Sequence, residues 1–208
     1  LTDQLTKLHN RRFLMQKLPE DLANTPADAN EQDFVFLLLD LDNFKQVNDT
    51  YGHTAGDLIL IQFSDLMKQV FRSSDYTIRW GGEEFLVVMR HMNRANAPAY
   101  AERLRRTVEQ HNFDIADGNS IKMTCSIGFA CFPDTQGEPA ILSWNQVIDV
   151  ADICLYAAKK SQRNAWIGVE KLAAHTGFQD LINDMSLSVA ANQVKIVSSI
   201  AADEIVWD

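Results

Sequence analysis

The chain has 208 residues, of which 46% are hydrophobic and 23% charged, as is ordinary for a globular protein. Its longest uninterrupted apolar run, 34–39, has six residues, whereas a helix needs roughly 20 to cross a bilayer. The formal net charge is −9. A negative surface repels polyanions, so this charge argues against sequence-independent binding to nucleic acid polymers. This charge is compatible with the binding of a small anion that a local basic pocket or metal ions would hold.

The cysteines indicate a reducing environment. The chain has three, Cys125, Cys131 and Cys154, which form no CxxC pair and lie in apolar stretches. We therefore interpret them as small buried hydrophobic residues rather than as ligands or disulfide partners. This favours a cytoplasmic location. The first residue is Leu1 and not Met, which indicates a segment of a longer protein or a processed chain.

The first half of the chain shows alternating helix and strand signals. Apolar residues at helical spacing predict a helix over 11–22, and 24–31 has loop composition. The apolar run 34–39 is typical of a strand buried on both faces. A long helix is predicted over 56–71. Two strand-like runs, 76–80 and 84–89, then flank Gly81-Gly82, which is a strong hairpin signal.

The second half continues this alternation. We expect a helix over 98–110, a strand over 121–132, a helix over 144–161 and a short strand over 166–169. The tight antiparallel hairpin favours an α+β fold, with a central, mainly antiparallel sheet flanked by helices, over a doubly wound parallel sheet. The pattern weakens after residue 169. A helix over 181–189 and a strand over 194–197 are compatible with it, and no function is assigned to this extension.

Two acidic features are candidates for chemistry. Asp40-Leu41-Asp42 directly follows the buried strand, and Glu83-Glu84 lies at the hairpin tip. If the two strands share a sheet, these carboxylates converge and require cations to neutralise them. Two Mg²⁺ ions beside a phosphate would make a phosphoryl or nucleotidyl transfer site. Taken singly, each feature is better interpreted as solvated acidic residues at a strand end.

Two further features each have an ordinary alternative. Gly81-Gly82 forms a simple hairpin turn, or it lets a bulky ligand approach the backbone. Lys159 and Arg163 lie one helical turn apart near a helix end, where they would hold phosphates. Taken alone, these two are better interpreted as solvated residues favoured by the helix dipole.

Read together, these segments resemble one known family. Residues 79–85, RWGGEEF, closely resemble the signature loop of the GGDEF family, the diguanylate cyclases, in its GGEEF form. Residues 3–12 resemble the entry motif DxLTxLxNRR, and 40–53 resemble the stretch DxDxFKxxNDxxGH. Residues 126–128 and 151–164 resemble the later blocks, so the resemblance covers residues 1 to about 168, which we expect to form one domain. One departure is Gln162, where the family usually has Gly.

The resemblance implies a fold similar to the palm of polymerases and nucleotide cyclases. It implies condensation of two GTP into cyclic di-GMP with release of two pyrophosphates, and Mg²⁺, or alternatively Mn²⁺, as cofactor. Asp40 and Glu83 would bind metal through their side chains and Leu41 through its carbonyl group. Glu84 would be a further ligand or help to deprotonate the ribose 3′-hydroxyl group.

The same resemblance implies how GTP is held. Asn48 and Asp57 would read guanine, whose N1–H and N2 amino groups both donate, whereas adenine has an acceptor at N1 and no amino group at C2. A mismatch would leave buried polar groups unpaired, at roughly 1–3 kcal/mol each. The remaining substrate-binding residues implied are Phe44, Lys45, Gly81, Gly82, Lys159 and Arg163.

A second nucleotide site is implied for the product. Arg72-Ser73-Ser74-Asp75 resembles the family's RxxD inhibitory motif, and Arg103 is a plausible partner. The alternative is a surface turn with a local ion pair worth under about 1 kcal/mol. One domain holds one GTP, so a homodimer is required for catalysis, with an upstream sensor or receiver module as the usual regulator.

Two other functions remain open at this stage. A catalytically silent domain would only bind GTP or cyclic di-GMP, although such domains have degenerate signature loops and this loop is intact. A nucleotide cyclase making cyclic GMP would share the palm but would not need the RxxD motif.

Overall fold

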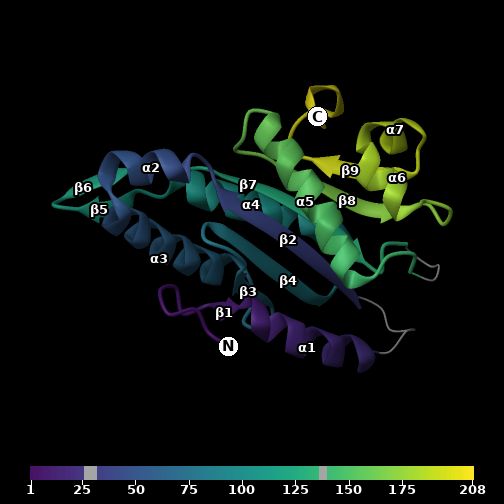
Figure 1. Ribbon diagram of the computed structural model, residues 1–208, viewed down its shortest axis with the longest axis horizontal. Helices are drawn as coiled ribbons and strands as arrows, with labels where there is room; N and C mark the ends of the chain where they lie inside the picture. The colour runs from purple at the N-terminus through teal and green to yellow at the C-terminus, as the bar shows by residue number, and fades with distance from the viewer. Residues whose placement is uncertain (26–31, 136–139) are drawn as a thin grey trace.

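The computed structural model describes residues 1–25, 32–135 and 140–208. Helices and strands alternate along the chain (Figure 1). The strands are β1 (His9–Asn10), β2 (Asp33–Leu41), β3 (Tyr76–Arg79), β4 (Glu84–Met92), β5 (Phe113–Ala116), β6 (Asn119–Ile121), β7 (Cys125–Phe132), β8 (Trp166–Leu172) and β9 (Val194–Ser198). The α-helices are α1 (Arg11–Ala23), α2 (Phe44–Tyr51), α3 (His53–Val70), α4 (Ala97–Gln110), α5 (Trp144–Lys160), α6 (Phe178–Asn183) and α7 (Met185–Ala190).

The central sheet has seven strands in the order β1-β3-β4-β2-β7-β8-β9. Four of its neighbouring pairs are antiparallel, and only β1–β3 and β7–β8 are parallel. The predicted α+β class with a mainly antiparallel sheet is confirmed. Since β2 lies at the centre, the residues at its end are surrounded by neighbouring strands on both sides.

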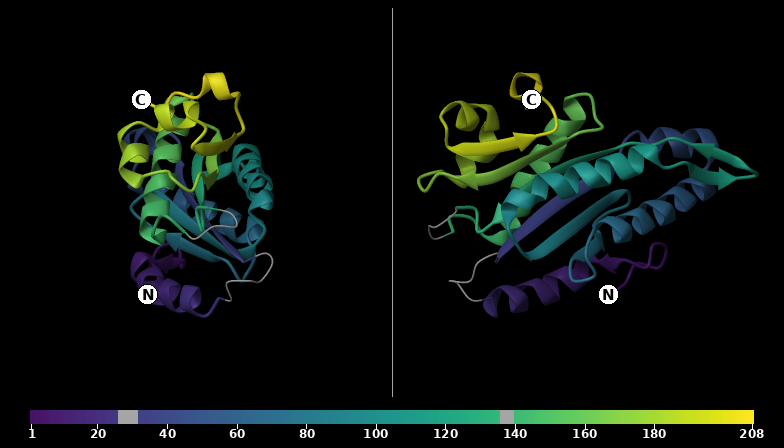
Figure 2. Two further views of the ribbon diagram at one scale, coloured as in Figure 1. Left: turned by 90° about the vertical axis from the view of Figure 1, so that its right-hand side faces the viewer. Right: turned by 180° about the vertical axis from the view of Figure 1, so that it is seen from behind.

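Both faces of the sheet are covered by helices (Figure 2). Successive residues of a strand point to opposite faces, so Val35, Leu37 and Leu39 join one cluster while Phe36 and Leu38 join the other. The first cluster also contains residues of α2, α3 and α4, and the second those of α1 and α5. Fully burying a side chain of this size contributes about 1.5–3 kcal/mol.

Helix α5 lies unusually close to β7. A Cβ atom built on Gly128 would lie 2.2 Å from the backbone oxygen of Ala151 and 2.2 Å from the backbone nitrogen of Leu155. No larger residue fits there without moving the helix. This close contact fixes the height of α5 over the sheet, and therefore the place of the basic residues at its C-terminal end.

Three local features differ from the sequence-based expectations. The strand expected over 121–132 is interrupted at 122–124, where the Thr124 carbonyl accepts a hydrogen bond from the Asp42 backbone N–H at 2.9 Å. β1 and the β5–β6 hairpin, which projects at one end of the molecule (Figure 1), were not expected. The expected loop 24–31 lies largely outside the described residues.

The C-terminal extension belongs to the same sheet. β9 pairs antiparallel with β8, and β8 itself continues past residue 168. The helix expected over 181–189 is divided into α6 and α7 at Asp184, whose side chain accepts a hydrogen bond from the Leu187 N–H. The division of the chain into a domain 1–168 and an extension stays a prediction.

Two observations concern the environment of the protein. Within the described residues, no helix is long and apolar enough to span a membrane. Cys125, Cys131 and Cys154 are all buried and carry free thiols. Burial raises the pKa of all three thiols, that of Cys131 to about 12.

Candidate active site

An open cleft lies where β2 ends, between the N-terminus of α2, the β3–β4 loop and the end of α5. It has a volume of about 440 Å³. Its lining comprises Asp40, Leu41, Asp42, Asn43, Phe44, Lys45, Gln46, Asp49, Glu83, Lys159 and Arg163. Seven of the residues proposed from the sequence are therefore brought together. Glu84, Gly81, Gly82, Asn48 and Asp57 do not line it.

Asp40 is the most perturbed acid of this cleft. It is 3% exposed, and one carboxylate oxygen, Oδ2, accepts a hydrogen bond from the Lys159 ammonium group. The other oxygen, Oδ1, is buried without a hydrogen-bond partner among the described residues. Burial raises the pKa of Asp40 to about 6, against the lowering effect of Lys159, and Glu83 and Glu84 raise it further. A cation bound at Oδ1 would offset the free-energy cost of burying the charged carboxylate.

The loop after β2 leads directly into helix α2. Asn43 precedes the helix in the left-handed conformation, with φ of 58°, and its side chain does not cap it. The first N–H groups of a helix have no partner within the helix, and they attract anions. Phe44 and Lys45, the first two residues of α2, line the cleft, where these N–H groups are available to phosphates.

The β3–β4 loop is held by Arg79. Its guanidinium group donates to the Gly82 carbonyl at 2.8 and 3.1 Å and pairs with Asp3 at 3.2 Å. Neither Gly81 nor Gly82 adopts a left-handed φ, and a Cβ atom on Gly82 would meet nothing within 4 Å. The turn therefore does not require glycine for its conformation, which favours the interpretation that the loop leaves room for a ligand.

The two candidate base readers lie on neighbouring helices outside the cleft lining. Asn48 is on α2, and its Oδ1 atom is buried without a hydrogen-bond partner among the described residues. It packs against Gly56 of α3, where a Cβ atom would lie only 1.9 Å from that oxygen. Asp57 directly follows Gly56 on α3 and is exposed. The Asn48 oxygen lacks a donor that an amino or N–H group of a base would supply.

The basic residues lie at the end of α5 and in the turn that follows it. Lys159 pairs with Asp40, and Arg163 lines the cleft from the turn. Gln162, Arg163 and Asn164 all adopt left-handed φ angles, of 78°, 64° and 48°. Gln162 thus takes a conformation that glycine adopts without steric cost.

Asp42 has a role that the sequence reasoning missed. Its carboxylate accepts hydrogen bonds from the hydroxyl groups of Thr124 and Ser126 at 2.6 and 2.7 Å, and from the Asn164 N–H at 3.0 Å. All these donors come from β7, the residue before it and the turn after α5. Asp42 therefore anchors the loop that carries Arg163. Its position directly after β2, two residues beyond Asp40, would have been the sequence signal for this.

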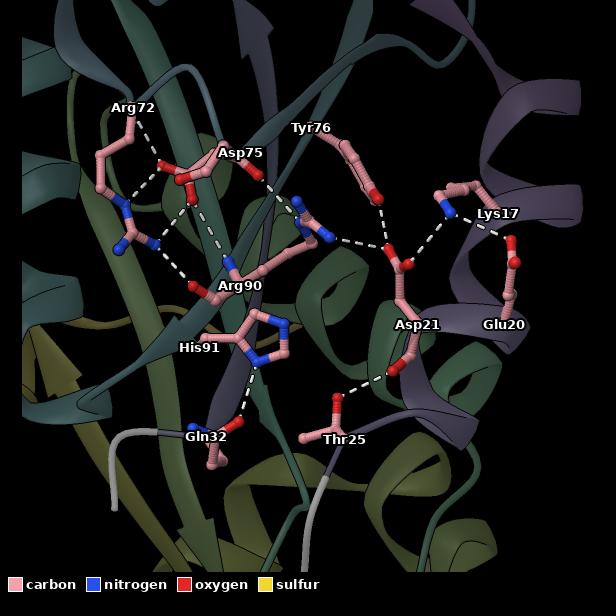
Figure 3. Close-up of polar contacts among 11 residues, drawn as sticks. Lys17, Glu20, Asp21, Thr25, Gln32, Arg72, Asp75, Tyr76, Arg90 and His91 are labelled. Atoms are coloured by element: carbon pink, nitrogen blue, oxygen red, sulfur yellow. Dashed lines mark hydrogen bonds and ion pairs between the residues drawn. The ribbon is translucent and has the colours of Figure 1, made fainter. Parts of the chain in front are cut away.

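Arg72 and Asp75 form a tight pair on the surface, shown in Figure 3. The Asp75 carboxylate accepts bonds from the Arg72 guanidinium and backbone N–H groups and from the Arg90 N–H. The Arg90 side chain continues the network to Asp21 of α1 at 2.9 Å and stacks over Tyr76 at 4.2 Å. Within the described residues, Arg103 is not part of this network.

Arg103 instead lies on the exposed side of α4. It lines a shallow depression of about 370 Å³ together with Arg106, Thr107 and Gln110 of the same helix. The structure brings Arg72 and Asp75 together, and within the described residues Arg103 makes no hydrogen bond or ion pair with either of them.

The residues fit a magnesium site that is completed by a ligand. The described residues contain no group of three or more His, Cys, Asp or Glu in a metal-binding arrangement. Mg²⁺, however, is usually held by one or two carboxylates together with substrate phosphates and water. The buried, unpartnered Oδ1 of Asp40 and the Glu83 side chain in the same cleft supply such a donor set.

Known proteins resemble this chain in sequence. A family model described as "Diguanylate cyclase, GGDEF domain" matches residues 1–165. Diguanylate cyclase DosC of Escherichia coli (strain K12) is 39% identical over 162 residues, which cover 78% of this chain and 34% of that protein. The chain thus spans about a third of the length of this curated relative.

Solved structures resemble it in fold. Diguanylate cyclase SiaD from Pseudomonas aeruginosa, in complex with its activator SiaC, has a TM-score of 0.70 at 32% identity and matches 80% of this chain and 61% of its own. The GGDEF domain of DgcB from Caulobacter crescentus, in complex with c-di-GMP, also has a TM-score of 0.70 at 28% identity. The latter match covers 80% of this chain and 94% of that chain.

Proposed function

Because the chain belongs to the GGDEF family of diguanylate cyclases, we propose that it condenses two GTP into cyclic di-GMP and releases two pyrophosphates. The observation that carries this proposal is the meeting of Asp40 and Glu83 in one cleft. Asp40 presents there a buried oxygen that has no hydrogen-bond partner in the part of the chain that the structure describes, and Glu83 comes from an intact signature loop.

The cleft would hold the triphosphate and its metal ions. Asp40, Glu83 and the Leu41 carbonyl group would bind Mg²⁺ or Mn²⁺, with Glu84 as a further ligand or as an aid to deprotonation. Bound metal supplies a lowered pKa for the attacking hydroxyl and charge neutralisation at the phosphates. The first N–H groups of α2, with Lys159 and Arg163, would hold the β- and γ-phosphates.

Guanine would lie beside α2 and α3. The Asn48 amide oxygen is buried and has no donor among the described residues, and the N2 amino group of guanine supplies one. The exposed carboxylate of Asp57 would accept from N1–H and N2. Adenine offers neither donor in these positions, so we propose GTP as the substrate of both halves of the reaction.

One chain contains one such site, and the product contains two equivalent nucleotides. A second copy must therefore present its GTP to the first across a two-fold axis. Each 3′-hydroxyl group then has to lie within about 3–3.5 Å of the opposite α-phosphate. We propose a transient homodimer as the active species, brought together in the whole protein by an upstream sensor or receiver module.

The Arg72–Asp75 pair is proposed as the product-inhibition site. The Arg72 side chain is 39% exposed, so its guanidinium group is accessible to a guanine edge or a phosphate. Arg103 would contact the bound product from a different position, since in the described ranges of the chain it makes no hydrogen bond or ion pair with Arg72 or Asp75. The buried free thiols and the use of GTP favour a cytoplasmic location.

Mass analysis of the product formed from GTP and Mg²⁺ tests the proposal. Cyclic di-GMP is expected, and Asp40→Asn and Glu83→Gln should each abolish turnover because each removes a ligand charge. Asp65→Asn, an exposed acid on α3 outside the cleft, is the matched control and should retain full activity. Cyclic GMP, or binding without turnover, would contradict the proposal.

A further inference from the structure

The turn after α5 is held in an unfavourable backbone conformation. Gln162, Arg163 and Asn164 are three successive non-glycine residues with left-handed φ. Side chains crowd the backbone in this region, so such a run persists only where surrounding contacts hold it. The middle residue, Arg163, lines the cleft. The position of its guanidinium group therefore depends on whatever fixes this turn.

The turn is held on one side by the body of the domain. The Arg163 N–H donates to the Ala158 carbonyl at 3.1 Å, and the Asn164 N–H donates to Asp42 at 3.0 Å. The Asn164 side chain accepts a bond from Arg105 of α4 at 3.0 Å. These contacts fix the inner side of the turn. At its two ends the Ser161 N–H donates to the Ala157 carbonyl of α5 at 2.8 Å, and the Ala165 carbonyl accepts from the Ile127 N–H of β7 at 2.9 Å.

The C-terminal segment adds further hydrogen bonds at those two ends. The Val206 N–H donates to the Ser161 hydroxyl group at 2.8 Å, just before the turn. Just after it, Trp166 accepts a backbone bond from the Ser199 N–H at 3.0 Å and donates its own N–H to the Ser199 hydroxyl at 2.9 Å. Residues 199–207 therefore bracket the turn on both sides. Figure 1 shows this last segment beside the C-terminal end of α5.

Covering the sheet edge explains only part of these contacts. The Ser199–Trp166 bonds extend the pairing of β8 with β9 by one residue pair, since β9 ends at Ser198 opposite Ile167, whereas the Val206–Ser161 bond lies outside the sheet. The segment continues beyond it, and Ile200, Ile205 and Trp207 pack against the hydrophobic cluster that contains Ala158 and Ala165. Ala158 lies in the last turn of α5, and Ala165 directly follows the strained residues. The segment is thus anchored to both of the elements that the turn connects.

We propose that residues 199–207 form a strap that positions Arg163 for the nucleotide, so that GTP affinity depends on the C-terminal extension. This inference rests on the proposed function, since it assigns the strap's effect to the phosphate contact of Arg163. The strap is a positioning element and does not touch the nucleotide. Loosening it allows the turn to relax and withdraws Arg163 from the cleft.

Val206→Pro is the sharpest test. It removes the N–H that bonds Ser161, while little packing is lost because Val206 is 44% exposed. Ile205 already has φ of −74° and ψ of 123°, the extended conformation that a residue before proline prefers. Ser161→Ala removes the same bond from its other end. Ser188→Ala, a buried serine of α7 distant from the turn, is the matched control.

The measurement is the calorimetric Kd for a non-hydrolysable GTP analogue with Mg²⁺, alongside Tm. Val206→Pro and Ser161→Ala should each weaken binding about threefold to tenfold, and the double variant no more than either. Gln162→Gly should reduce the effect of Val206→Pro to under about twofold, because glycine holds the turn without help. Hydrogen exchange at Arg163 and Asn164 should accelerate in Val206→Pro before any nucleotide is added.

The outcomes separate two failures. If the wild-type chain binds the analogue and Val206→Pro binds it equally well, with Tm lowered or not, the strap is structural only and the inference is wrong. If Ser188→Ala weakens binding as much as Val206→Pro does, the effect is general destabilisation and the inference is equally wrong. A wild-type chain that binds no guanine nucleotide overturns the proposed function, and this inference with it.

Discussion

The ammonium group of Lys159 lies against the carboxylate of Asp40, and α5 and β2 thereby meet through opposite charges at the end of the sheet. This pairing does not compensate the carboxylate for its burial. Burial raises the pKa of Asp40 to about 6 although Lys159 lowers it, and the nearby Glu83 and Glu84 raise it further. The metal-free protein thus carries a costly negative charge at neutral pH.

Asp40→Asn should therefore stabilise the metal-free protein, and more so at high pH. A carboxyl group whose folded-state pKa lies above the ordinary value of 3.8 costs stability as pH rises from about 4 through 6. The rise in the pKa of Asp40 from 3.8 to about 6 corresponds to about 3 kcal/mol of folding free energy. In EDTA, the Tm of the variant minus that of the wild type should be larger at pH 8 than at pH 4.5. Asp49→Asn, an exposed acid of the same cleft, is the control, and an equal Tm difference at both pH values would contradict the assignment.

Gly56→Ala should weaken GTP binding through Asn48. The new Cβ atom would lie 1.9 Å from the Asn48 Oδ1 atom, so the amide has to move from its present position. We expect KM for GTP to rise at least about fivefold, as for a lost hydrogen bond to the base. Asn48→Ala should have a similar effect, and the double variant should be no worse than the single ones. Additive effects would show that Gly56 acts independently of Asn48.

Arg72→Ala should weaken the binding of cyclic di-GMP. The guanidinium group is exposed on one side while Asp75 holds it on the other, so it is oriented before a ligand arrives. Calorimetry should show at least a tenfold higher Kd, because hydrogen bonds to a charged group are worth about 1.5–3 kcal/mol. Lys68→Ala removes a positive charge from the same end of α3 and serves as control. Equal loss in both variants would indicate only a general charge effect.

The specific activity of the chain should rise with its concentration. Each copy has one cleft, and the net charge of −9 together with two bound nucleotides opposes the approach of the two catalytic faces. A parallel dimeric coiled coil fused before Leu1 should raise activity at low concentration by increasing the effective concentration. Activity that stays constant over a hundred-fold dilution, with a monomer by sedimentation, would exclude the two-copy site.

Local sequence patterns were sufficient for most of the secondary structure. The apolar run at 34–39 predicted the central strand, because such a short run is typical of a strand buried on both faces. β1 was missed because its two residues gain their strand geometry from pairing with β3, a contact distant in sequence. The break at 122–124 was missed for a similar reason, since β6 pairs with β5 in a separate hairpin whereas β7 pairs with the distant β2.

For the site, the sequence identified which residues lie in the cleft better than it identified the contacts that each of them makes. Asp40, Glu83, Lys159 and Arg163 meet in one cleft as the motifs suggested. No sequence pattern indicated that Lys159 would pair with Asp40 in the metal-free protein. Nor did any pattern show that the Asp42 carboxylate would bond to the turn carrying Arg163, because such contacts depend on tertiary packing.

The burial of the three native thiols has a practical consequence for spectroscopy. Cys125, Cys131 and Cys154 are 0–2% exposed, and the raised pKa of each keeps it in the unreactive thiol form at neutral pH. A cysteine introduced on the surface would therefore react with a maleimide dye ahead of all three. Fluorescent or spin labels can then be attached one at a time to the folded wild-type background, without first replacing any native cysteine.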